Sequence, residues 1–138
     1  MPSVDAMDKN GSATAKTDIA FYGVDTNNTI VFTYFDVAEN KAEVDSEGNW
    51  VAPANTTTKR SLGNDYYMVK ASSIGKEWFE QVDAFQQSTV GKTVEDVLSM
   101  ELDNGKAVDT DVLSSCTIGL IEFLNSLTSA SQYIKAIQ

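Results

Sequence analysis

Along the chain, apolar positions first cluster in strand-like runs and later recur at helical spacing. The segments 19–24 and 29–35 are rich in β-branched and aromatic residues, and Asp25-Thr26-Asn27-Asn28 between them is typical of a turn. We expect these two segments to pair as a β-hairpin. A second, weaker hairpin is expected over 41–51, around the polar run 45–49. The pattern therefore predicts that the ordered chain begins with an antiparallel sheet.

The middle of the chain changes to helical spacing. A helix is expected to begin near Ser72 or Ser73, because either hydroxyl can accept hydrogen bonds from first-turn amides. Its apolar face, with a buried tryptophan, is made of Ile74, Trp78, Val82 and Phe85. Residues 93–96 have the form of a capping box and predict a short helical turn. Residues 98–102 alternate like a half-buried strand, and 103–106 should turn the chain after it.

The last predicted element is the longest. From Asp111 onward, apolar residues recur at steps of three, four and seven: Leu113, Cys116, Leu120, Leu124, Leu127 and Ile134. We expect one long amphipathic helix laid against the sheet. Residues 54–71 lack a clean period and are expected to form an irregular connection. Strands followed by helix, strand and helix predict an α+β fold, in which hairpins form an antiparallel sheet and a second, shorter helix packs on the C-terminal one.

The length of 138 residues fits one domain. Residues 1–17 are polar and have no periodicity, so we expect them to be a flexible lead-in. Residues 18–138 are then expected to form the single α+β domain.

Charge and missing residue types narrow the function. The chain has 20 acidic and 10 basic residues, a net charge of -10, which disfavours binding to nucleic acid or to anionic lipid. It has no histidine and one cysteine, Cys116, so no catalytic residue and no metal ligand is predicted, and a non-catalytic role is favoured. No apolar run approaches the ~20 residues of a membrane span, so we expect no membrane insertion of this segment.

One segment gathers groups that could hold a ligand. Asp111, Ser114, Ser115 and Thr117 lie where the chain is expected to enter the long helix. Unpaired first-turn amides and the helix dipole attract anions, so this point is a candidate seat for a phosphate. Asp111 repels an anion, and a cation such as Lys106 would have to lie close by. The alternative is that Asp111, Ser114 or Ser115 only caps the helix, which the spacing alone favours.

Residues 111–117 resemble the D-x-x-S-G-A-T motif of the bacterial FMN-binding domain family, although Ser115 and Cys116 stand where the motif has Gly-Ala. In that family a flavin transferase joins FMN to the final threonine through a phosphoester. The domains belong to exported or membrane-anchored electron-transfer proteins. The resemblance implies that Thr117 would carry FMN and that Asp111 would belong to the signal recognised by the transferase.

A second resemblance covers nearly the whole expected domain. The segments 58–68, 71–81, 90–93 and 114–118 are similar to an uncharacterised group of Gram-positive surface lipoproteins that is distantly related to the FMN-binding family. This resemblance implies an extracytoplasmic domain, at the cell surface or membrane-anchored through a segment outside this sequence. It implies as partner a small phosphate-bearing ligand or another surface protein. The alternative function is a structural or interaction domain without flavin.

Overall fold

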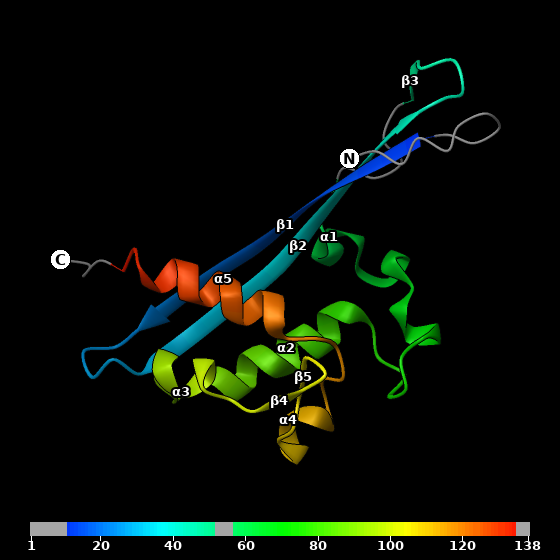
Figure 1. Ribbon diagram of the computed structural model, residues 1–138. Coiled ribbons are helices and arrows are strands. Elements are labelled where there is room, and N and C mark those ends of the chain that lie inside the picture. Colours follow the sequence, from blue (N-terminus) through cyan, green and yellow to red (C-terminus); the bar gives the residue numbers. More distant parts are fainter. Residues whose placement is uncertain (1–10, 52–56, 135–138) are drawn as a thin grey trace.

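The computed structural model describes residues 11–51 and 57–134 and has the α+β architecture that the sequence predicts (Figure 1). Strands β1 (Gly11–Val24) and β2 (Ile30–Val44) form a long antiparallel hairpin, and the short β3 (Trp50–Val51) pairs with the far end of β2. The elements that follow are α1 (Lys59–Leu62), the 3-10 turns η1 (Gly63–Tyr66) and η2 (Met68–Lys70), α2 (Trp78–Thr89), α3 (Val94–Leu98), the hairpin β4 (Leu102–Asp103) and β5 (Lys106–Ala107), α4 (Thr110–Leu113), and α5 (Ile121–Ser131). Figure 1 shows the helices gathered along one part of the hairpin, while the end that bears β3 extends beyond them. No helix of the described residues is long and apolar enough to span a membrane.

The first predicted hairpin is confirmed and is longer than expected. Its pairing runs from Gly11 opposite Val44 to Val24 opposite Ile30, with a bulge next to Val24. Asp25 closes the turn by accepting hydrogen bonds from the amides of residues 27 and 29. The expectation of a flexible lead-in is wrong for residues 11–17, which form the first half of β1; residues 1–10 lie outside the described residues. Cross-strand pairing orders this polar segment without apolar periodicity, which is why hydrophobic pattern alone missed it.

The core lies between one face of the hairpin and the helices α2 and α5. Three phenylalanines from these elements pack on one another, with ring centroids 5.2 to 6.2 Å apart: Phe35, Phe85 and Phe123. Trp78 is 3% exposed and its ring lies 6.0 Å from that of Phe123, so the predicted burial of this tryptophan against the C-terminal helix is confirmed.

Helix α2 begins later than expected. Its N-cap is Glu77, which forms a capping box with Glu80, and the predicted start near Ser72 or Ser73 is wrong. The Ser72 hydroxyl instead accepts hydrogen bonds from the amides of residues 74 and 76, so it stabilises a turn ahead of the helix. Residues 93–96 do form the predicted capping box at the start of α3.

Two other stretches differ from expectation. The connection expected to be irregular over 54–71 contains three short helical elements where it is described: α1 and η1 cover residues 59–66, and η2 covers residues 68–70. The strand expected over 98–102 is reduced to β4, since Leu98 still belongs to α3. The turn predicted at 103–106 is confirmed: Asn104 and Gly105 have φ values of 49° and 80°, as a tight two-residue hairpin loop requires.

The long C-terminal helix is the main correction. Residues 114–120 separate α4 from α5, so two helices stand where one was expected. Serine, threonine and glycine in this segment are weak helix formers. Backbone groups find partners elsewhere: the Thr117 amide donates to Gln81 Oε1 at 2.9 Å, and the Leu120 amide to the Gly105 carbonyl at 2.8 Å. Apolar spacing continued through a loop because that loop also buries Cys116 and Leu120.

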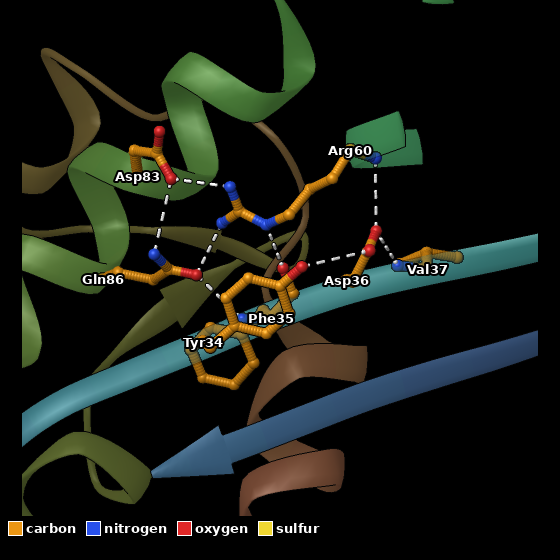
Figure 2. A network of polar contacts seen from close by, with 7 residues as sticks. All are labelled: Tyr34, Phe35, Asp36, Val37, Arg60, Asp83 and Gln86. Atoms are coloured by element: carbon orange, nitrogen blue, oxygen red, sulfur yellow. Dashed lines mark hydrogen bonds and ion pairs between the residues drawn. The ribbon is translucent and has the colours of Figure 1, made fainter. Parts of the chain in front are cut away.

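Side chains close the outer edge of β2 at Phe35 (Figure 2). The Phe35 amide donates to Gln86 Oε1 at 2.8 Å, and the Phe35 carbonyl accepts from Arg60 Nε at 2.7 Å. The same guanidinium donates to Gln86 Oε1 at 2.6 Å and to Asp83 Oδ1 at 2.7 Å. Asp36 accepts from the backbone amides of Arg60 and Val37. Arg60 and Gln86 therefore take the place that a further strand would occupy and tie α1 and α2 to the sheet.

Candidate functional site

A cavity of about 530 Å³ opens between the hairpin, α2 and the start of α5. This size suits a small organic ligand. We call it the lysine cavity because three lysines line it: Lys16, Lys59 and Lys106. Trp78, Gln81 and Thr117 also line it. Met68, Ile118 and Phe123 add apolar surface to its wall. The cavity thus combines cations, a hydroxyl and an aromatic surface in one place.

Gln81 fixes one wall of the lysine cavity. Its side chain is fully buried, and its Oε1 accepts from the Thr117 amide at 2.9 Å and from the Thr117 hydroxyl at 3.1 Å. Its Nε2 donates to Ser72 Oγ at 3.1 Å and to the Lys76 carbonyl at 3.2 Å. A buried amide with its hydrogen bonds satisfied on both ends holds α2, the turn before it and the loop before α5 in fixed relation. Thr117 is therefore positioned by α2 as well as by its own loop.

The three lysines differ in how they are held. Lys16 Nζ lies 3.6 Å from Glu122 and 3.8 Å from Asp18, both of which also line the cavity. Lys59 Nζ pairs with Glu39 at 3.2 Å. Lys106 has no ion pair in the part of the chain that the structure describes. Three lysines against two carboxylates make the lining positive, on a chain whose net charge is -10.

Lys59 also stacks against aromatic rings. Its Nζ lies 5.0 Å from the ring centre of Tyr66 and 5.7 Å from that of Trp78. Burial lowers the pKa of Lys59, but its interactions with Tyr66 and Glu39 outweigh burial and leave that pKa above its ordinary value. Lys59 is therefore a fixed positive charge at every physiological pH.

The predicted site residues do not come together. Thr117 lines the lysine cavity, whereas Ser114, Ser115 and Asp111 do not. Ser114 Oγ donates to the Asp111 carbonyl at 2.7 Å, and Ser115 Oγ to the Val112 carbonyl at 3.3 Å. These hydroxyls satisfy carbonyls of α4, at the end of a helix where the dipole repels anions. The expected cluster at a helix start is therefore wrong, because the break before α5 moves both serines to the end of α4.

The start of α5, and not that of α4, borders the lysine cavity. Gly119 and Glu122 line the lysine cavity, so the first turn of α5 reaches it together with Thr117. Lys106, the cation that an anion seat near Asp111 would need, also lines the cavity. Sequence reasoning missed Lys16, which lay in the presumed lead-in, and Gln81, which falls beside the apolar face of α2. Lys16 stands in no motif, and Gln81 is only the last residue of the segment 71–81, so the three-dimensional arrangement is what identifies both.

Cys116 is fully buried. Burial raises the pKa of its thiol to about 11, so the thiolate is scarce at neutral pH and the residue packs as a small apolar side chain. No group of three or more His, Cys, Asp or Glu residues within the described ranges could hold a metal ion.

Comparisons with known proteins give no match: no family model, no curated protein and no solved structure is significantly similar to the chain. The likeness to FMN-binding domains and to surface lipoproteins therefore depends on the sequence segments that carry it. The chemistry of the lysine cavity is the independent ground on which a function can be argued.

Proposed function

We propose that the chain is a non-catalytic binding domain that holds a small, phosphate-bearing aromatic ligand in the lysine cavity. FMN is the ligand that the resemblance implies. The observation that carries the proposal is the gathering of Lys16, Lys59 and Lys106 around Trp78 and Thr117 on an otherwise acidic molecule.

Each part of the cavity suits one part of such a ligand. The ammonium groups of Lys16 and Lys106 favour a phosphate, to which they can donate charge-assisted hydrogen bonds. The apolar wall with Trp78 favours a planar ring system. The Thr117 hydroxyl lies on the same cavity, where a ligand phosphate held by the lysines would be close to it. Nothing in this arrangement requires a general base, which agrees with a chain that has no histidine.

Titration calorimetry with FMN and with riboflavin tests the proposal. The two ligands share the ring system and differ in the phosphate, so we expect FMN to bind at least about tenfold more tightly, a difference of about 1.4 kcal/mol. Lys106→Gln should remove most of that difference. Lys41→Gln is the matched control, because it removes the same charge from the part of the hairpin that bears β3. Equal affinity for the two flavins, no binding of FMN, or equal weakening by both variants would contradict the proposal.

The covalent form of the proposal has its own test. Co-expression with a flavin transferase, followed by intact-mass measurement, should give the mass of one attached FMN. Thr117→Val should abolish that mass gain, and Thr128→Val should leave it unchanged, since the Thr128 hydroxyl lies outside residues 111–117 and donates to the Leu124 carbonyl of its own helix. An unmodified mass for the natural sequence would exclude attachment and leave reversible binding to be judged by calorimetry.

The place of action is part of the same proposal. The lipoprotein resemblance supports a domain that works outside the cytoplasm, at the cell surface or membrane-anchored. Fractionation of cells that express the full-length protein tests this location. Recovery in the cytosol would contradict it.

A second candidate function is an interaction domain without flavin, with another surface protein as partner. It is favoured by aromatic side chains on the face of the hairpin turned away from the core. Phe21 and Phe32 are 60% and 50% exposed, and Phe21 lies opposite Tyr34 with ring centroids 6.1 Å apart. Aromatic groups of this kind are enriched at protein interfaces. Failure of both flavin tests would bring this function forward.

A further inference from the structure

The outer edge of β1 borders a groove of about 670 Å³ against α5. Five consecutive residues of β1, 16–20, line this groove. Side chains of a strand alternate between its two faces, so consecutive residues can border one groove only along the strand's edge. In the described chain, β1 is an edge strand that pairs with β2 alone.

The backbone groups at this edge point into the groove. Phe35 directs its amide and carbonyl away from β1, as its bonds to Gln86 and Arg60 show. Residues directly opposite each other in an antiparallel pair turn their backbone groups either toward each other or both away. Ala20 is opposite Phe35 and therefore turns its own groups to the open edge. By the same alternation Asp18 and Lys16 do so as well, whereas residues 17 and 19 bond to β2.

A carboxylate oxygen at the groove also lacks a hydrogen bond from the described residues. Oδ1 of Asp18 is buried and accepts no hydrogen bond from the described residues. Its nearest cation, Lys16 Nζ, lies at 3.8 Å, which is an ion-pair distance but too long for a hydrogen bond. A buried acceptor left in this state costs free energy that a new donor would recover.

The far wall of the groove favours a strand with basic side chains. On the α5 side, Ser126, Ser129 and Ala130 line the groove with small side chains, beside the larger Asn125, Glu122 and Tyr133, so we expect the side chains of an added strand to fit beside the three small residues. The charged residues of the lining are Lys16, Asp18 and Glu122, and Lys16 is already paired with both acids. The groove therefore carries a net negative charge, as does the molecule around it.

We propose that this groove binds an extended, basic segment of another protein, which adds to the sheet as a strand alongside β1. Main-chain hydrogen bonds to residues 16, 18 and 20 hold the segment, and lysine or arginine side chains meet Asp18 and Glu122. The groove and the lysine cavity are neighbouring sites that share three lining residues, Lys16, Asp18 and Glu122.

Hydrogen exchange with a probe peptide tests the strand addition. The probe alternates valine with lysine over about eight residues, a usual strand length. A matched peptide with glutamate in place of lysine is the charge control. On adding the lysine peptide, the amides of Lys16, Asp18 and Ala20 should become protected, while those of Thr17 and Ile19, already bonded to β2, should change little. The lysine peptide should bind at least about tenfold more tightly than the glutamate peptide.

Two variants separate the groove from other surfaces. Ser129→Arg places a large cation in the groove and should weaken the lysine peptide about tenfold or more. Thr128→Arg adds the same charge to α5 at a residue that does not line the groove, and should leave affinity unchanged. Ser129 does not line the lysine cavity, so FMN affinity should survive either change. Protection without the alternating pattern, or confined to residues around Phe21 and Phe32, would overturn the proposal. Concentration-dependent protection of the same amides without peptide would overturn it in favour of pairing between copies of this chain.

Discussion

The two halves of the β1–β2 hairpin share one register from Gly11 to Gly23 but differ in what supports them. The body half, residues 18–37, lies against the helices and contributes Ile30, Phe35 and Val37 to the core. The arm half, residues 11–17 and 38–51, includes β3 and contributes no residue to the core cluster of the described chain. Its largest apolar side chain, Trp50, is 66% exposed.

The difference shows that two strands can stay paired through backbone hydrogen bonds even where their side chains do not pack against a core. In the body half, apolar side chains turn toward α2 and α5, and burial stabilises the pairing. In the arm half, backbone pairing continues over polar and small residues, with ion pairs such as Lys41–Glu43 at 3.0 Å. We therefore expect the arm to open locally at low free energy, while the body unfolds only with the whole domain.

The sharpest way to test this contrast is to weaken the body. Trp78→Ala removes a buried ring that contacts Tyr66 and Phe123, and should lower the free energy of unfolding by about 3–5 kcal/mol. Hydrogen exchange should accelerate in the body half and stay nearly unchanged in the arm half, whose amides open locally. Equal acceleration in both halves would mean that the hairpin is one cooperative unit and would break the comparison.

A smaller effect is expected at the junction between helices and sheet. Arg60→Met removes the guanidinium that donates hydrogen bonds to the Phe35 carbonyl, Asp83 and Gln86. It should lower the free energy of unfolding, measured in a denaturant melt, by about 1–3 kcal/mol. Arg60→Lys keeps the charge but cannot reproduce the fork of donors, so it should recover only part of the loss. Full recovery of stability by Arg60→Lys would show that the positive charge alone stabilises this junction, without the set of hydrogen bonds at the edge of β2.

The smallest effect is expected in the arm. Lys41→Ala breaks the Lys41–Glu43 pair, in which the lysine side chain is 50% exposed, and should change the free energy of unfolding by no more than about 1 kcal/mol. A thermal melt with Lys59→Ala gives the comparison, because Lys59 lies on α1, is only 14% exposed and stacks on Tyr66 and Trp78, although its ion-pair partner Glu39 lies at the border of the arm half. A larger loss at Lys41 than at Lys59 would contradict the assigned order of support.

The parts of the fold that sequence predicted are those where local chemistry is decisive. Asp25 and its neighbours gave the hairpin turn, residues 93–96 gave the cap of α3, and the spacing of Trp78, Val82 and Phe85 gave the buried face of α2. The extent of β1 could not be read in this way, because residues 11–17 are ordered by a partner strand far along the chain. The break before α5 was hidden for a similar reason: Gln81 supplies its hydrogen bonds from another helix.

The candidate site was predicted in part. Thr117, Lys106 and Glu122 of the first turn of α5 all line the lysine cavity; whether it holds an anion stays a prediction. Ser114, Ser115 and Asp111 do not line the cavity. The hypothesis placed them at the start of one long helix, but they lie in α4 or directly after it. Lys16 and Lys59 come from segments with no helical or strand-like apolar pattern, so hydrophobic periodicity carries no information about them.

The side chains of Arg60 and Gln86 have a consequence for assembly. With Phe35 already engaged and β3 paired at the far end, β2 offers little template for further growth, and the sheet can extend mainly from β1. A sheet with one long free edge can add a strand there but offers no second long edge for a further molecule to pair with. Two copies joined through β1 would each use the long free edge of the described sheet and form a closed pair, and a foreign strand would occupy that same edge. The molecule can accept a strand without propagating a fibre.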